Sequence, residues 1–197
     1  MKNITAKFLL VVMVLTTFSS CKKSFLELNP PTNLTPSQAL GTEADLLVAL
    51  RGAYAGLRAT AMYGRSLMVI GDMMADNTYQ SVLNTNRYTL FNNYTYNVTD
   101  GDVTGLWQQA YAVILRVNNI INANVSGPNV NQYKGEARAI RALCYFELVR
   151  YFARPFTDNP NAYGVPLVLT YNADLKPGRN TIAEVYNQIH ADLNSAY

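Results

Sequence analysis

Apolar side chains recur at three- and four-residue intervals in five segments of this chain, and this spacing constrains the fold more than any other feature. The first segment opens with Thr42 and Asp45 at capping-box spacing and continues as a one-sided stripe of Leu46, Leu50, Ala53, Tyr54, Leu57 and Ala61. The five predicted helices span about residues 42–63, 66–76, 102–123, 131–152 and 181–197, and the position of Asp102 predicts that it is the N-cap of the third. Helices without an alternating strand pattern predict an all-α architecture in which neighbouring helices pair antiparallel across turns.

Composition excludes several classes of protein. With 49% hydrophobic and 15% charged residues among 197, the chain can bury enough surface to fold. Without Lys2 and Lys7 of the N-terminal segment, 14 basic side chains face 13 acidic ones, so the electrostatic footprint of a nucleic-acid binder is missing. One histidine and two cysteines cannot build a zinc cluster or a disulfide framework, and we expect no metal or cofactor.

The N-terminus has the pattern of a secreted protein. Lys2 and Lys7 precede an apolar run at residues 8–15, which is shorter than the roughly 20 residues of a membrane span and predicts a signal peptide over residues 1–20. Cys21 follows two small residues and resembles the lipidated cysteine of bacterial lipoproteins; the alternative is an ordinary signal peptide. More than one acyl chain on Cys21 would anchor the protein stably.

Residues 21–40 predict an extended tether, because three prolines at positions 30, 31 and 36 exclude a helix there. The second cysteine, Cys144, lies within a helical stripe and is interpreted as a small buried hydrophobic residue, since a lipidated Cys21 cannot pair with it.

The segment from Asn77 to Thr99 is the candidate binding loop. It is polar, rich in Asn, Thr and Tyr, and lies between predicted helices, where binding loops are usually found. Sugar rings stack on aromatic faces and their hydroxyls pair with amides and guanidinium groups. Residues that can supply these contacts are Tyr79, Arg87, Tyr88, Asn92, Asn93, Tyr94 and Tyr96. The alternative is that these tyrosines cover the helical core and the amides form turns.

Other candidate groups favour structural roles. Trp107 and Tyr111 lie one turn apart on an apolar helical face and are interpreted as core. Asp72 and Asp76 share one helical turn, so they cannot flank a substrate as a glycosidase pair must. A further group is interpreted as an ion network that braces adjacent helices: Glu136, Arg138 and Arg141.

One long run carries a family resemblance. Residues 135–150 resemble the GEAxxxRAxxYFxLVR segment of SusD/RagB-family outer-membrane nutrient-binding lipoproteins. Further matching stretches follow the family's order at residues 21–27, 71–72, 107–121, 163–167 and 181–193. Small residues beside aromatic ones in this run are also typical of tetratricopeptide-like packing, although no strict period of about 34 residues is present.

The resemblance implies both fold and function. It implies a tetratricopeptide-like helical scaffold with long loops, with residues 41–197 forming the N-terminal helical domain of a longer protein. It also implies a surface-exposed, lipid-anchored lid over a SusC-like TonB-dependent barrel in the outer membrane, which captures an oligosaccharide or a peptide without cleaving it. Two alternatives from other classes are a helical scaffold that binds only proteins and a surface glycosidase.

Overall fold

The computed structural model describes residues 39–172 and 174–197. The predicted signal peptide, Cys21 and all but the last two residues of the predicted tether lie outside these residues, and so does position 173.

Within the described residues the chain is all-helical, which confirms the predicted fold class. No strand forms there; the one bridge pairs Tyr163 with Thr181. No helix in this part of the chain combines the length and apolarity that a membrane span requires. The helices are α3 (Glu43–Leu57), α4 (Ser66–Met74), α5 (Thr89–Asn92), α6 (Gly101–Asn122), α7 (Val130–Phe152) and α8 (Ile182–Ala196).

Two helix starts form as their sequences predict. At α3 the Thr42 hydroxyl accepts a hydrogen bond from the Asp45 backbone N–H at 3.2 Å, and the Asp45 carboxylate accepts from the Thr42 N–H at 2.9 Å. At α8 the Thr181 and Glu184 pair repeats this reciprocal capping, with distances of 3.2 and 2.8 Å. These contacts satisfy backbone donors that a helix cannot pair internally.

Two other boundaries differ from the sequence prediction. The N-cap of α6 is Asp100, whose carboxylate accepts from the Asp102 N–H at 2.8 Å, so the predicted cap at Asp102 is wrong. The first helix ends at Leu57 and not at Tyr63; hydrogen-bonded turns follow, and a Cβ at Gly64 would lie 2.4 Å from the Arg58 carbonyl oxygen. A close approach of this kind requires glycine.

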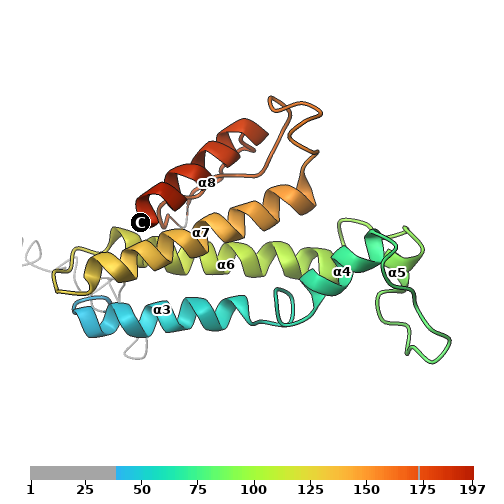
Figure 1. Cartoon of the computed structure of the whole chain (residues 1–197), viewed down its shortest axis with the longest axis horizontal. Helices are drawn as coiled ribbons and strands as arrows, with labels where there is room; N and C mark the ends of the chain where they lie inside the picture. Colours follow the sequence, from blue (N-terminus) through green and yellow to red (C-terminus); the bar gives the residue numbers. More distant parts are fainter. Residues whose placement is uncertain (1–38, 173) are drawn as a thin grey trace, which may run out of the picture. The chain divides into compact units, whose positions relative to one another are not determined.

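The core lies between four of the helices (Figure 1): α6 packs against α3 and α7, and α8 packs on α7. Trp107 and Tyr111 pack partly buried against this core, as their positions predicted, with ring centroids 5.0 Å apart. Completely buried apolar side chains from these helices include Leu46, Ala53, Ala110, Val113, Ile114, Val117, Ala137, Ile182 and Val185.

A buried polar network joins α6, α7 and α8. Arg141 donates from Nε and Nη2 to the Asp192 carboxylate at 2.8 and 2.5 Å, and from Nη1 to the Asn118 side chain at 2.8 Å. Asn118 in turn donates to the Val168 carbonyl at 2.7 Å, which ties the segment between α7 and α8 to α6. Arg141 therefore braces neighbouring helices as predicted, through partners on α6 and α8. The predicted ion network does not include Glu136 or Arg138, since neither forms an ion pair within the described residues.

Candidate ligand-binding site

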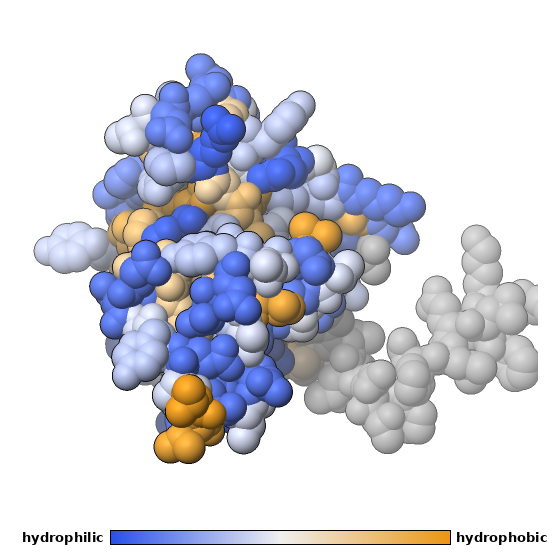
Figure 2. Space-filling view, turned by 90° about the vertical axis from the view of Figure 1, so that its right-hand side faces the viewer, coloured by the Kyte–Doolittle hydropathy of each residue, from blue (hydrophilic) through white to orange (hydrophobic). Residues whose placement is uncertain are grey.

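The segment between α4 and α6 contains an unusual amount of left-handed backbone. All four non-glycine residues with positive φ in the described chain lie here: Asp76, Asn86, Tyr88 and Tyr94, with φ values of 55°, 60°, 59° and 54°. Such conformations are costly for residues with a Cβ and persist where surrounding contacts enforce them. The segment, which includes the one-turn helix α5 that the sequence did not predict, lies at the α4 end of α6 (Figure 1). Figure 2 views the molecule from this end, where hydrophilic side chains cover most of the face and apolar ones form small patches.

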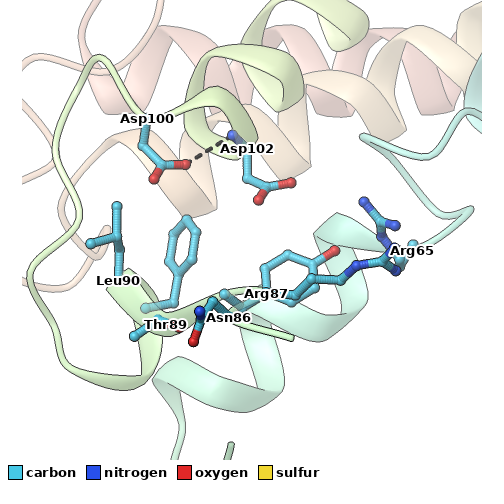
Figure 3. Close-up of a pocket in the computed structure, with 9 residues that line it drawn as sticks. Arg65, Asn86, Arg87, Thr89, Leu90, Asp100 and Asp102 are labelled. Carbon is cyan, nitrogen blue, oxygen red and sulfur yellow. Dashed lines mark hydrogen bonds between the residues drawn. The ribbon is translucent and has the colours of Figure 1, made fainter. Parts of the chain in front are cut away.

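A pocket of about 310 Å³ opens between this segment and the start of α6 (Figure 3). We call it the polar pocket. Thr89, Leu90 and Phe91 of α5 form part of its wall, and the polar side chains from outside α5 are Arg65, Asn86, Arg87, Tyr88, Asp100 and Asp102.

Hydrogen bonds hold the carboxylate side of the polar pocket in place. Asp100 is fixed by capping α6, and Asp102 in the first turn of that helix accepts from the Ser66 hydroxyl at 2.9 Å. Ser66 is only 1% exposed and also contacts the Tyr88 hydroxyl at 3.0 Å. Because these side chains come from α4, from the residue before α5 and from α6, one buried hydroxyl ties together the three elements that build the pocket.

Arginines bring the positive charge. The guanidinium carbon of Arg65 lies 5.6 Å from the centroid of the Tyr88 ring, within the range of a cation–π contact. Arg65 enters from the start of α4 and Arg87 from the segment before α5, whereas the carboxylates enter from α6 (Figure 3). Neither arginine forms an ion pair with a carboxylate of the described residues. The pocket therefore offers strong donors and strong acceptors from different walls.

The predicted loop residues separate into groups. Arg87 and Tyr88 line the polar pocket, whereas Tyr96 lines a second, apolar pocket and stacks on Phe91 at a centroid distance of 5.0 Å. Tyr79 is 84% exposed and stands apart from both pockets.

The remaining three predicted residues form hydrogen bonds within the segment. Asn92 accepts from the Gln80 N–H and donates to the Asn93 side chain, both at 3.0 Å. The Tyr94 hydroxyl donates to the Asp76 carboxylate at 2.9 Å, and this hydrogen bond, with desolvation, raises the pKa of Tyr94. The Tyr94 hydroxyl therefore holds the end of the segment against the residues that follow α4.

Sequence reasoning missed five polar residues of this pocket: Arg65, Asn86, Thr89, Asp100 and Asp102. The sequence predicts Asp102 as a helix cap, because a carboxylate just before an apolar stripe has that pattern. Capping by Asp100 instead leaves the Asp102 side chain in the pocket wall. Arg65 is 23 residues from Tyr88, and only the fold brings the two side chains together.

Residues 135–150 of α7, which carry the family resemblance, make contacts that hold the helices together. A Cβ on Gly135 would lie 2.7 Å from the Ala196 carbonyl oxygen, so this glycine permits the close approach of α7 and the end of α8. Glu136 accepts a hydrogen bond from the Tyr54 hydroxyl of α3 at 2.9 Å. Tyr145 both donates to and accepts from the backbone of Val168, at 2.8 and 2.7 Å.

The chain resembles known proteins along most of its length. Residues 24–197 match the SusD-like_3 family, described as "Starch-binding associating with outer membrane". A relative from Formosa agariphila, SusD-like protein P2, is 34% identical over 94% of this chain and 36% of its own length. The chain thus spans about a third of the length of the curated relatives it matches.

Solved structures show the same fold. The SusD-like carbohydrate binding protein from Bacteroides vulgatus is 26% identical with a TM-score of 0.64, covering 78% of this chain and 34% of that one. A crystal structure described with xylogluco-oligosaccharide is 28% identical with a TM-score of 0.56, covering 75% of this chain and 29% of that one. SusD-like binding proteins are not catalysts. By its match over residues 24–197 and its helical fold, the chain belongs to the SusD-like family.

Proposed function

We propose that this chain is the N-terminal helical part of a cell-surface lipoprotein that binds an oligosaccharide and presents it to a SusC-like TonB-dependent barrel. Residues 1–20 are the signal peptide, Cys21 carries the lipid, residues 21–40 are the tether and residues 41–197 are the helical domain. The family's described association with the outer membrane supports this arrangement.

The polar pocket is the observation that carries the binding proposal. A sugar hydroxyl both donates and accepts, so it pairs at once with the guanidinium of Arg87 or Arg65 and with a carboxylate of Asp100 or Asp102. Hydrogen bonds to charged groups contribute about 1.5–3 kcal/mol each, more than those between neutral partners. The charges of the two arginines and two aspartates cancel, and a neutral, hydroxyl-rich ligand leaves this net charge of the pocket unchanged.

The exposed tyrosines extend the site beyond the pocket. Tyr79 is 84% exposed and Tyr94 is 53% exposed, so each presents a ring face to which the apolar side of a sugar ring can stack. Tyr88 has a different role, because Arg65 lies over its ring and Ser66 holds its hydroxyl. Further contacts come from Asn92, Asn93 and Tyr96 of the same segment.

The geometry favours binding without bond cleavage. Glycoside hydrolysis needs two carboxyl groups on opposite sides of the scissile bond. Asp100 and Asp102 both stand at the start of α6, where the first is committed to capping and the second accepts from Ser66. They therefore approach a ligand from one side.

Calorimetric titration of the purified chain against a panel of neutral oligosaccharides and short peptides tests this function. We expect saturable binding of an oligosaccharide that Arg87→Ala weakens at least tenfold, since it removes a charged donor from the pocket. Arg51→Ala, an exposed arginine on α3, is the matched control and leaves the affinity unchanged. Binding of peptides alone, or equal affinities for the two variants, contradicts the proposal.

The transporter partner has its own test. Co-purification of the lipoprotein from outer membranes with a large TonB-dependent barrel, and an adjacent gene for such a barrel, are the expected results. Recovery of the lipoprotein without any barrel under mild detergent would argue for a binding protein that acts alone.

A further inference from the structure

A second pocket, of about 280 Å³, lies beside the polar pocket, and we call it the apolar pocket. Helices α4, α6 and α7 and the segment at residues 96–98 enclose it. Its aliphatic wall consists of Ile70, Met74, Val98, Val103 and Leu106. No charged side chain lines it.

Aromatic rings form the rest of this wall, from Phe91, Tyr96, Tyr151 and Phe152. The Tyr151 hydroxyl donates to the Leu67 carbonyl at 2.6 Å, so the polar end of this side chain is already paired. Tyr96 lies nearly parallel to Phe91, with centroids 5.0 Å apart and planes inclined by 18°. The lining is therefore apolar and rich in flat surfaces, which suits an uncharged ring and disfavours an ion.

The size of the apolar pocket fits a single ring. An apolar cavity of about 150 Å³ in a protein core binds benzene, so about 280 Å³ holds a ring with a short substituent. Val98 is 84% exposed although it lines the pocket, so the opening to solvent lies at the segment that carries it. A ring can enter there without unfolding a helix.

Asn97 is the one lining residue with an amide side chain. The Asn97 side-chain oxygen accepts from the Thr99 N–H and hydroxyl at 2.9 and 2.6 Å, while its amide nitrogen has no acceptor within the described residues. That amide can donate to an oxygen on the ligand. Asn97 is exposed, so its amide can meet an oxygen substituent on a ring that enters from solvent.

We propose that the apolar pocket binds an uncharged aromatic ring with an oxygen-containing substituent, which is attached to the glycan held in the polar pocket. Phe91 lines both pockets, so ring and sugar are separated by one side chain. The attachment to a glycan rests on the proposed function, whereas binding of the ring depends only on the apolar pocket.

Benzyl alcohol is the probe, and ligand-observed NMR titration of the full chain is the measurement. Val98→Asp places a charge at the opening and weakens benzyl alcohol binding at least tenfold. Val82→Asp is the matched control, because Val82 is fully exposed in the same loop and lines neither pocket; it changes binding less than twofold. Val103→Phe fills the pocket without adding polarity and abolishes binding, while circular dichroism reports an unchanged fold.

Absence of saturable benzyl alcohol binding, or equal weakening by Val98→Asp and Val82→Asp, overturns the proposal. Phenyl glucoside and methyl glucoside test whether the ring and the sugar bind together. If they do, phenyl glucoside binds at least tenfold more tightly than methyl glucoside and than benzyl alcohol. Benzyl alcohol binding that survives Arg87→Ala, with no oligosaccharide bound by the unmodified chain, refutes the proposed function but leaves the ring site standing.

Discussion

The buried pair of Arg141 and Asp192 offers the sharpest stability prediction. The two side chains are 7% and 3% exposed, and the carboxylate takes two of the guanidinium's hydrogen bonds. Asp192→Ala leaves the buried guanidinium with Asn118 as its remaining side-chain partner. Removing one partner of a buried pair costs about 3–5 kcal/mol, because the other charge stays in the interior without compensation.

This loss is large against the roughly 5–15 kcal/mol that stabilises a domain. It corresponds to a fall in Tm of roughly 6–20 °C, at about 2–4 °C per kcal/mol for a domain of this size. Urea unfolding followed by circular dichroism measures the free energy of unfolding directly. Asp158→Ala is the control: that exposed carboxylate, outside the helices, forms no ion pair within the described residues, and its loss shifts stability by less than about 0.5 kcal/mol.

A double variant separates burial from pairing. Arg141→Met with Asp192→Leu removes both charges and keeps an apolar volume, so we expect it to recover more than half of the stability that Asp192→Ala loses. A loss below about 1 kcal/mol for Asp192→Ala would refute the reasoning. So would a double variant that is no more stable than the single one.

Three further predictions concern other parts of the chain. A Cβ at Gly71 would lie 2.6 Å from the Tyr151 hydroxyl oxygen, so Gly71→Ala should destabilise by about 1–3 kcal/mol in urea unfolding and by clearly less in a Tyr151→Phe background; equal losses contradict the contact. Burial raises the pKa of the Cys144 thiol to about 12, so iodoacetamide should leave it unmodified at pH 8 until the chain unfolds. Because this pKa lies above the unfolded value of about 8.5, Cys144 favours unfolding increasingly as pH rises above 8.5, and Cys144→Ala should flatten that part of the stability curve. Cys21→Ala should move the protein from the membrane fraction to the soluble fraction, and retention in the membrane would contradict the lipid anchor.

The sequence predicts the helices because their signals are local. Reciprocal capping at Thr42 and Thr181 depends on residues three positions away, and apolar stripes report the buried face of each helix. The same locality explains the errors. Two aspartates near the start of α6 both have the composition of a cap, and only the backbone geometry selects Asp100.

The site is less predictable because its parts meet through the fold. Composition identified the segment between α4 and α6, and with it Arg87 and Tyr88. The composition of this segment does not indicate the other residues of the polar pocket, because Arg65 precedes α4 and Asp102 belongs to α6. The partner of Arg141 lies 51 residues away on α8, a separation that no local pattern encodes.

The central claim is that the polar pocket holds a sugar. The most direct measurement is a crystal structure of the protein with the oligosaccharide that binds most tightly in the titration panel. We predict a sugar ring in the polar pocket, with hydroxyls within about 3.2 Å of the Arg87 guanidinium and the Asp102 carboxylate. A sugar bound elsewhere, with the polar pocket empty, would contradict the account.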